Sequence, residues 1–377
     1  MSAAEFIPVC EPLLAGNEAA YVSDCVTSGW ISSAGDYLAR FEQGMAALCQ
    51  VGHGVACANG TAALHLACAA LGLGPGDEVI CPAFSIISTA NSIVQTGATP
   101  VLADVEADTL CLDPAQVAEL ITPRARAIMP VHMYGHPADM DPLMQLAEKH
   151  GLVVIEDAAQ VHGARYKGQP LGGIGEMGCF SFFANKLITT GEGGMVVSDD
   201  PELAQKLRRL RNLAHGPKRF EHHELGFNYR LTNLQAALGL AQLERLEATK
   251  ARKAAIGDRY NHNLADLPGV TLYWGRHRPQ ASPVMWMYGL LLPPGLDRDA
   301  AMDRLREQGV DTRAFFLPLH QQPMYDGAHP GLPDLRGGHP VSEDAGRRGL
   351  YLPSGAGLSE AQVDRASQAL RDLVLRG

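Results

Sequence analysis

Lys186 and the apolar segment before it are the part of this sequence that is best suited to covalent chemistry. Lys186 follows the apolar run CFSFF and precedes the glycine-rich run TTGEGG, so a strand and a turn should hold it in apolar surroundings. Such surroundings favour the unprotonated amine, which is the form that attacks an aldehyde. The alternative is an ordinary solvated lysine in a loop, and the neighbouring residues alone leave that alternative open.

Asp157 is the second candidate, because it ends the apolar segment LVVIED of a predicted strand. Open α/β sheets bind their ligands at the carboxyl ends of their strands. The two-residue period of a strand places Asp157 and Ala159 on the same face. A carboxylate that only caps the next turn is an equally good interpretation of this position.

The segment Ala58-Asn59-Gly60-Thr61 opens an Ala- and Leu-rich stretch that is predicted to be helical. Unpaired N–H groups and the positive end of the helix dipole suit an anion there, most simply a phosphate. A plain helix capped by Asn59 is the competing interpretation, and this segment by itself favours it.

Gly173, Gly175 and Gly178 match the G-x-G-x-x-G pattern of dinucleotide-binding loops but lack its context. That pattern requires a strand before it and a helix after it. Here a charged turn, RYKGQP, precedes the glycines and the apolar run CFSFF follows them. We therefore interpret the segment as a loop.

The elements that position these residues alternate between helix and strand from about residue 55 to 200. Helices are predicted over 59–73, 114–121 and 141–150, and strands over 78–84, 99–105 and 152–159. This pattern predicts an α/β fold, with a mainly parallel sheet between two layers of helices. A long helix over about 233–256 should lead to a smaller α+β domain, which the helix 359–374, capped by Ser359, completes. The predicted domains are 1–250 and 251–377, and the first 25 or so residues are candidates to pack on the smaller one.

Composition excludes several classes of protein. The 377 residues are 46% hydrophobic and 19% charged, which supports a sizeable core and argues against disorder. A net charge of −10 argues against binding nucleic acid or an anionic membrane over the whole surface. The sequence starts without a secretory pattern and has no membrane-spanning apolar run, so a cytoplasmic location is expected. The eight cysteines contain no C-x-x-C pair, and we predict neither disulfides nor a metal site.

Nine motifs together resemble one known family in order and spacing. They are GWISSAG (29–35), NGTAALHLA (59–67), GDEVICPAFSIISTAN (76–91), GATPVLADV (97–105), PVHMYGHPADMD (130–141), IEDAAQVHGA (155–164), FSFFANKLITTGEGG (180–194), LGFNYRLTNLQAALGLAQLE (225–244) and TRAFFLPLHQQPMY (312–325). The sequence is similar to the DegT/StrS group of fold-type I sugar-nucleotide aminotransferases, and within that group it looks most like the GDP-perosamine synthases. The resemblance implies the fold of the fold-type I aminotransferases, in which the large domain contains a mainly parallel sheet of seven strands.

The same resemblance implies pyridoxal 5'-phosphate as cofactor, pyridoxamine phosphate as its intermediate form, and glutamate as amino donor. Lys186 would bind the cofactor covalently and move a proton, and Asp157 would keep the ring nitrogen protonated. The other implied contacts are Gly60, Thr61 and Ser181 with the phosphate, Ala159 and Ile86 with the ring, Gln160 with the phenolic oxygen, and Asn228 with the phosphate in a neighbouring subunit. The active unit would therefore be a homodimer with shared active sites.

Two positions depart from the family pattern. Relatives usually stack an aromatic side chain on the ring where this sequence has Ile86, and an aliphatic cover forfeits roughly 0.5–1.5 kcal/mol of ring–ring stabilisation. Phe84, two residues earlier, is the alternative cover if the loop register differs. His136 stands where glutamine is common, and the resemblance implies no role for it.

The implied reaction aminates a nucleotide-linked keto sugar, most simply GDP-4-keto-6-deoxymannose to GDP-perosamine. The candidate substrate residues lie in family-like motifs and are Trp30, Ser32, Arg230, Arg313 and His320, although His320 could equally order the Pro-rich loop around it. A UDP- or dTDP-linked 3- or 4-keto sugar is the main alternative substrate. A sugar dehydratase of the same family would have His in place of Lys186, and a cofactor-free Schiff-base aldolase or a regulatory sugar-nucleotide-binding protein are more distant alternatives.

Overall fold

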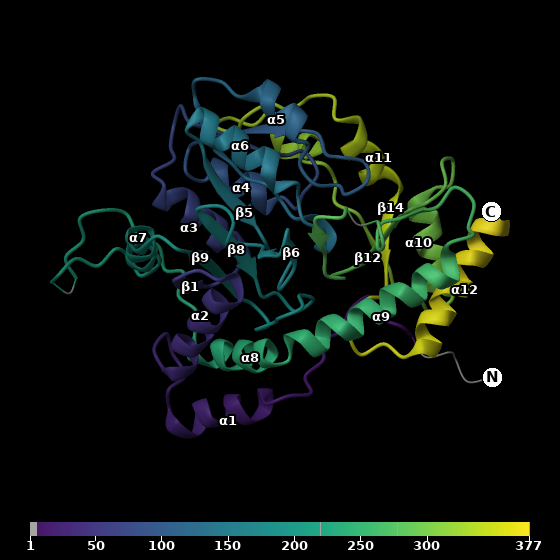
Figure 1. Ribbon diagram of the computed structural model, residues 1–377, viewed down its shortest axis with the longest axis horizontal. Coiled ribbons are helices and arrows are strands. Elements are labelled where there is room, and N and C mark those ends of the chain that lie inside the picture. The colour runs from purple at the N-terminus through teal and green to yellow at the C-terminus, as the bar shows by residue number, and fades with distance from the viewer. Residues whose placement is uncertain (1–5, 219, 277, 377) are drawn as a thin grey trace.

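The larger part of the chain is built on a seven-stranded sheet (Figure 1). The computed structural model describes residues 6–218, 220–276 and 278–376. The strands are β1 (His53–Cys57), β2 (Glu78–Pro82), β3 (Thr99–Ala103), β4 (Ala125–Ile128), β5 (Val153–Asp157), β8 (Met177–Ser181) and β9 (Gly194–Ser198). Their order is β1-β9-β8-β5-β4-β2-β3, and of these seven strands β9 alone runs in the direction opposite to the other six. The predicted mainly parallel sheet is confirmed.

Helices cover both faces of this sheet. Successive residues of a strand point to opposite sides, so a strand that is apolar throughout gives the sheet two apolar faces to bury. Val79 and Cys81 of β2 belong to one buried core, and Ile80 between them belongs to the other. The first core includes α3 (Gly60–Ala70), α4 (Ser88–Val94) and α7 (Pro201–Arg211). The second includes α2 (Asp36–Cys49), α5 (Pro114–Leu120), α6 (Met140–His150) and α8 (Asn233–Glu244). The three helices predicted over 59–73, 114–121 and 141–150 correspond to α3, α5 and α6.

A second, antiparallel sheet lies in the C-terminal third of the chain, in the order β10-β12-β14-β13. Its strands are β10 (Thr271–Leu272), β12 (Tyr288–Leu291), β13 (Arg313–Ala314) and β14 (Gly349–Leu352), and its helices include α10 (Arg298–Glu307) and α12 (Glu360–Arg376). These elements share a separate buried core. The predicted cap of the last helix is confirmed, since the Ser359 hydroxyl accepts a hydrogen bond from the Gln362 N–H at 3.3 Å. Three short strands, β6 (Arg165–Tyr166), β7 (Gln169–Pro170) and β11 (Ala281–Ser282), form a third sheet.

The amino-terminal segment contacts both parts of the chain. Ile7 belongs to the core of the smaller sheet, and its N–H donates to the Gly309 carbonyl at 2.8 Å. Further on, α1 (Glu18–Ser28) packs against α8. Residues 1–5 of the predicted packing segment lie outside the described residues. The division into domains at residue 250 stays a prediction.

The long helix predicted over 233–256 is two helices instead of one. Arg245 leaves helical geometry, with φ −111° and ψ 7°, and separates α8 from α9 (Leu246–Leu264). The break lets α8 pack on α1 and α2, while α9 runs on along the base of the molecule to α12 (Figure 1). The amino-acid pattern misses this break because Arg245 is a good helix former, and packing alone decides it.

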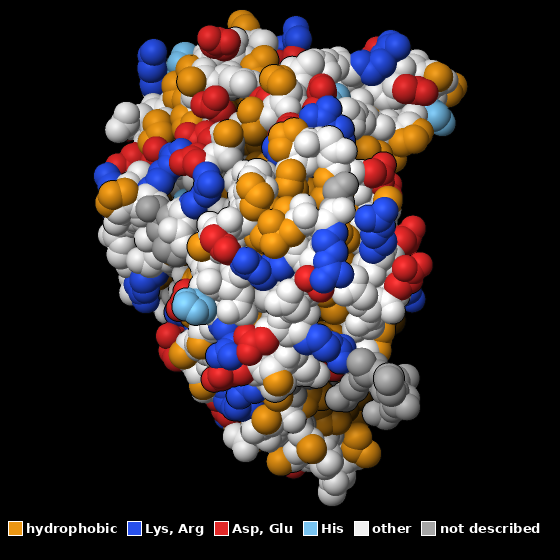
Figure 2. Space-filling view, turned by 90° about the vertical axis from the view of Figure 1, so that its right-hand side faces the viewer, with side chains coloured by type: hydrophobic (Ala, Val, Ile, Leu, Met, Phe, Trp, Pro, Cys, Tyr) orange, Lys and Arg blue, Asp and Glu red, His pale blue; other side chains and the backbone are white. Residues whose placement is uncertain are grey.

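Figure 2 shows the face of the molecule formed by the C-terminal elements. Acidic and basic side chains are interspersed over it, so this face offers a nucleic acid no continuous basic surface. In the described part of the chain, no helix is both long and apolar enough to cross a membrane.

Candidate active site

A cavity of about 580 Å³ lies at the carboxyl ends of β5 and β8, where open α/β sheets bind ligands. Its size is within the range of about 300–1,000 Å³ that is typical of ligand pockets. Eight of the predicted cofactor residues line it together: Gly60, Thr61, Ile86, Asp157, Ala159, Gln160, Ser181 and Lys186. Residues separated by up to 126 positions (186 − 60) thus meet at one end of the sheet.

Lys186 lies in the segment after β8, and its side chain forms part of the cavity wall. Its N–H donates to the Phe183 carbonyl at 2.9 Å, which closes the turn that carries it. Burial lowers the pKa of the Lys186 amine to about 7, although the negative charge of Asp157 acts in the opposite direction. Near neutral pH a large fraction of this amine is therefore unprotonated and able to act as a nucleophile.

Asp157 is the last residue of β5 and is 2% exposed. Its Oδ1 accepts a hydrogen bond from the Ala159 N–H at 3.2 Å, and its Oδ2 accepts one from the Thr89 hydroxyl at 3.2 Å. Burial raises the pKa of this carboxyl, while the Ala159 N–H, the charge of Lys186 and the Thr89 hydroxyl lower it. The carboxylate both caps the next turn and lines the cavity, where a cationic partner would stabilise its charge.

Gln160 is buried, and its amide has a fixed orientation. Its Oε1 accepts a hydrogen bond from the Tyr134 N–H at 2.6 Å. Tyr134 adopts a left-handed backbone conformation (φ 50°, ψ 29°), which brings this N–H to the amide and is unusual for a residue with a side chain. Because the amide oxygen is engaged, the NH₂ group of Gln160 is the part that can donate into the cavity.

The start of α3 and the end of β8 meet at the other side of the cavity. Asn59 Oδ1 accepts a hydrogen bond from the Ala62 N–H at 2.8 Å, as the capping interpretation predicts. This cap leaves the N–H groups of Gly60 and Thr61 without an intrahelical partner and suitable for an anion. A Cβ on Gly60 would lie 2.6 Å from the Cβ of Ser181, so glycine permits the close approach of these two segments.

Ile86 lines the cavity, and 44% of it is exposed. Phe84, the alternative ring cover, is fully buried. Its ring centroid lies 5.9 Å from that of Phe315 and 6.1 Å from that of Phe316. Phe84 therefore belongs to the core, and the structure does not bring its ring to the cavity.

The remaining predicted residues lie outside the cavity of a single chain. They are Asn228, Trp30, Ser32, Arg230, Arg313 and His320. Arg230 donates to Asn212 Oδ1, and the Arg313 side chain is exposed. His320 is 7% exposed, and its Nε2 lies 3.2 Å from Glu343 Oε1, so it holds the Pro-rich loop against α11 (Pro340–Arg348). Substrate contacts by these residues stay predictions.

Trp286 and Tyr351 line the cavity beside Phe316, and neither of the two lies in any of the nine motifs. These residues come from the C-terminal third, far from Lys186 in the sequence, and tertiary packing alone brings them there. Ser88 lies within a recognisable motif, FSIISTAN, but its role is visible only in the structure. Its Oγ lies 2.7 Å from Thr61 Oγ1 at the cavity wall.

The glycine-rich segment 172–178 surrounds a carboxylate of the protein itself. Three backbone N–H groups of this segment donate to Glu156 at 2.7 to 2.8 Å, and His132 Nε2 lies 3.0 Å from the same carboxylate. Residues 172–176 form turns and bends, which confirms the interpretation of this part as a loop, whereas Gly178 already belongs to strand β8. Glu156 next to Asp157 is thereby fixed in the interior.

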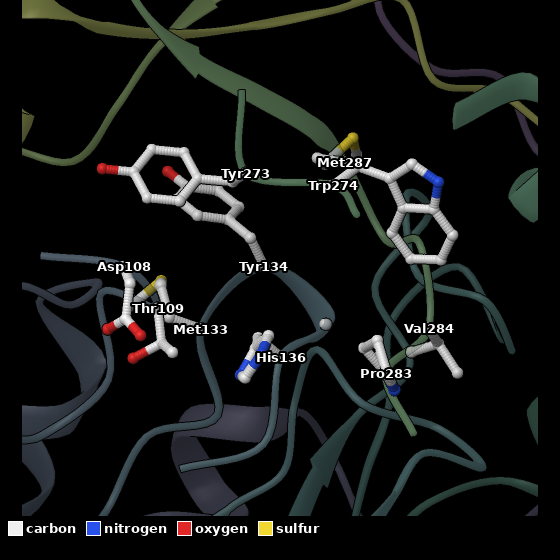
Figure 3. Close-up of a pocket in the computed structure, with 11 residues that line it drawn as sticks. Asp108, Thr109, Met133, Tyr134, His136, Tyr273, Trp274, Pro283, Val284 and Met287 are labelled. Carbon is white, nitrogen blue, oxygen red and sulfur yellow. The ribbon is translucent and has the colours of Figure 1, made fainter. Parts of the chain in front are cut away.

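Figure 3 shows a second hollow, which borders the loop that carries Tyr134 and His136. Its volume is about 20 Å³, which is room for about one water molecule and not for a cofactor. His136 Nδ1 lies 2.8 Å from the Pro137 carbonyl, so His136 acts within this loop and not in the cavity. In the described chain, no cluster of His, Cys, Asp or Glu side chains is arranged to hold a metal ion.

Comparison with known proteins identifies the family. A family model described as the DegT/DnrJ/EryC1/StrS aminotransferase family matches residues 12–371. The chain is 46% identical over 378 residues to the GDP-perosamine synthase of Caulobacter vibrioides, with 98% of each chain covered. It is 40% identical to the GDP-perosamine synthase of Escherichia coli O157:H7, covering 95% of this chain and 96% of that one. The crystal structure of S. venezuelae DesV superposes with a TM-score of 0.88 at 39% identity, covering 96% of this chain and 95% of that one.

These matches confirm the resemblance carried by the nine sequence motifs, and they agree with the parallel sheet and the cavity at its carboxyl edge. The chain therefore belongs to the DegT/DnrJ/EryC1/StrS family, and it is an aminotransferase.

Proposed function

We propose that this aminotransferase carries pyridoxal phosphate on Lys186 and transfers the amino group of glutamate to GDP-4-keto-6-deoxymannose, which gives GDP-perosamine. The observation that carries the choice of substrate is the 46% identity, over 98% of both chains, to an enzyme named GDP-perosamine synthase. The E. coli relative has the same name.

The polar groups of the cavity fit the parts of this cofactor. The N–H groups of Gly60 and Thr61 and the Ser181 hydroxyl suit a phosphate, and the buried carboxylate of Asp157 suits a protonated ring nitrogen. Gln160 has its oxygen occupied and its NH₂ group available, which suits a phenolic oxygen. Each kind of donor or acceptor that the cofactor needs is thus present in the lining of this one cavity.

When bound, pyridoxal phosphate supplies an aldehyde that links to an amine and a ring that withdraws electrons from the carbon bearing that amine. Lys186 supplies the protein's amine and, with a pKa of about 7, can accept or release a proton near neutral pH. Asp157 stabilises the positive charge on the ring nitrogen. Asp157 ends β5 and Lys186 follows β8, and these two strands are adjacent and parallel, so the sheet holds the two residues near one another.

A second copy of the chain would supply the positive charge that the cavity lacks. Among the described residues that line it, Lys186 is the only lysine or arginine, while Asp157 and Glu192 are acidic. The phosphate of the cofactor, glutamate and the diphosphate of the sugar nucleotide together carry several negative charges. Charged groups of this kind need cationic partners when they leave water. We therefore infer that the homodimer, with shared active sites, is the active unit.

The segment after α7 is the part of the chain that would reach the second copy. Figure 1 shows it projecting from the body of the molecule. It exposes 92% of Leu225 and 73% of Phe220, large apolar side chains of the kind that subunit contacts bury. Asn228 and Arg230 follow on the same segment, outside the cavity of their own chain.

Mixing two inactive variants tests the shared site. Lys186→Ala and Asn228→Ala, unfolded together and refolded as mixed dimers, should recover up to about a quarter of the wild-type rate, because half of the dimers are mixed and each has one intact site. Lys186→Ala mixed with Asp157→Asn is the control and should recover nothing, since both residues serve the site of their own chain. Recovery in neither mixture would show that Asn228 serves its own chain.

A panel of nucleotide-linked keto sugars tests the substrate. With glutamate as donor, kcat/KM for GDP-4-keto-6-deoxymannose should exceed the values for UDP- and dTDP-linked 3- and 4-keto sugars by at least about tenfold. Mass spectrometry should find an amine in place of the keto oxygen, and NMR should place it at the sugar's 4-position. A higher kcat/KM for a dTDP- or UDP-linked sugar would contradict the proposed substrate, and loss of a sugar hydroxyl without amination would contradict amino transfer.

A further inference from the structure

Trp286 makes the closest aromatic contact of the Lys186 amine. It lies in the segment between β11 and β12, is 3% exposed and lines the cavity. The Nζ of Lys186 lies 3.7 Å from the centroid of the Trp286 ring. At that distance the ammonium group is in direct contact with the face of the indole, which is the strongest aromatic partner for a cation.

The same indole also binds the backbone that carries Lys186. Its Nε1–H donates to the carbonyl of Asn185 at 2.9 Å. Its ring lies nearly parallel to that of Tyr134, with centroids 5.8 Å apart and an interplanar angle of 16°. Trp286 therefore packs on Tyr134, the residue whose N–H donates to Gln160. It contacts both the Lys186 amine and the backbone carbonyl that precedes Lys186.

We propose that Trp286 is a positioning residue for Lys186, giving the amine a fixed resting place whenever it is not covalently engaged and fixing the loop behind it. This inference rests on the proposed role of Lys186 as the residue that binds the cofactor. It explains why a side chain from the C-terminal third lies against a lysine of the large sheet. A lysine with five single bonds to its amine has many other conformations, and contact with the ring excludes most of them.

Other groups also bear on the charge of Lys186. Asp157 and the Cys10 thiol raise the pKa of its amine, and burial lowers it. The further titratable or charged groups near it are His162, which is buried and interacts with its charge, Lys253 in the hollow behind its loop, and Glu192, Tyr229 and Tyr351 in the cavity wall. None of these groups is itself replaced in a Trp286 variant. Loss of the ring contact lowers the midpoint of the Lys186 titration, whereas entry of water raises it, so the direction of the shift separates the two effects.

The experiment measures the initial rate at which cofactor-free protein binds added pyridoxal phosphate covalently, as a function of pH, with borohydride reduction and peptide mapping to locate the adduct. The variants are Trp286→Leu, which keeps an apolar side chain without a ring, and Trp286→Phe, which keeps a weaker ring and loses the N–H. Trp274→Leu is the matched control, because Trp274 is an indole of the same region whose Nε1–H donates to Asp258 and not to the Lys186 loop.

The ring stabilises the ammonium form, so Trp286→Leu should move the midpoint of the pH profile down by about one unit and Trp286→Phe by about half of that. Trp274→Leu should leave it unchanged. An unchanged midpoint in folded Trp286→Leu, or a midpoint raised by entry of water, would overturn the inference. If Trp286→Leu does not fold, Trp286→Phe decides, and an unshifted profile there contradicts the inference. Wild-type protein without an adduct at Lys186 would instead refute the proposed function.

Discussion

Replacing Lys186 by alanine is expected to remove covalent cofactor binding and to lower the rate of amino transfer by at least about 10³-fold. Two functions are lost together: the nucleophile that links to the aldehyde, and the amine that carries the proton. The low pKa of about 7 makes Lys186 suited to both near neutral pH. The rate is measured as 2-oxoglutarate released from glutamate in a single turnover, with pyridoxal phosphate in excess.

Lys167→Ala is the control for a lysine that only carries surface charge, since its side chain is 55% exposed and pairs with Asp141. It should retain the wild-type rate. Both variants should keep the wild-type melting temperature without cofactor to within a few degrees, because neither removes a large apolar group. A single-turnover rate in Lys186→Ala within tenfold of wild type would contradict the assignment of Lys186.

Replacing Asp157 by asparagine is the second large effect, an expected loss of about 10²–10³-fold in kcat. The amide is nearly isosteric but has no charge to keep the ring nitrogen protonated. The loss should fall mainly on kcat, because the charge matters most when electrons move toward the ring. Binding of pyridoxal phosphate, followed by its absorbance, should weaken by a smaller factor of about tenfold to a hundredfold.

Thr89→Val is the graded control for Asp157. It removes only the hydroxyl that donates to Asp157 Oδ2 and leaves the charge in place. Because that hydroxyl lowers the pKa of the buried carboxyl, the variant should raise it further and lower kcat by about tenfold. Equal kcat values for Asp157→Asn and wild type, with cofactor saturating, would contradict the role of the carboxylate.

The sequence predicts the parts of the site that depend on local order. Asp157 ends one strand, Ala159 and Gln160 come directly after it, and Lys186 follows the next strand of the sheet, so periodicity and the parallel sheet already place them at one edge. The family motifs add the predicted phosphate contacts of Thr61 and Ser181. From their own segments alone, Thr61 would be an ordinary residue at a helix start and Ser181 an ordinary residue at a strand end.

Other parts depend on packing between distant segments, which no local pattern encodes. Tyr351 reaches the cavity from β14 of the smaller sheet, and Trp286 reaches it from the segment before β12. The aromatic side chain of Phe84 lies in the core, while Ile86 lines the cavity. The helical pattern over 233–256 continues through Arg245, but the backbone leaves helical geometry at this residue. The helix before it packs on α1 and α2, and the helix after it packs on α12. Asn228 is predicted to act across a subunit contact, so its contact with the cofactor depends on a second chain and not on local sequence.

Borohydride reduction of the wild-type protein saturated with pyridoxal phosphate shows directly whether Lys186 is the residue that binds the cofactor. Peptide mapping by mass spectrometry should find one modified residue per chain, Lys186, in the peptide that contains ANKLITTGEGG. Glutamate added before the reduction should prevent the modification, because amino transfer to the cofactor releases Lys186. An adduct on another lysine would contradict the role of Lys186 in binding the cofactor, and an adduct at Lys186 that glutamate leaves unchanged would contradict amino transfer from glutamate.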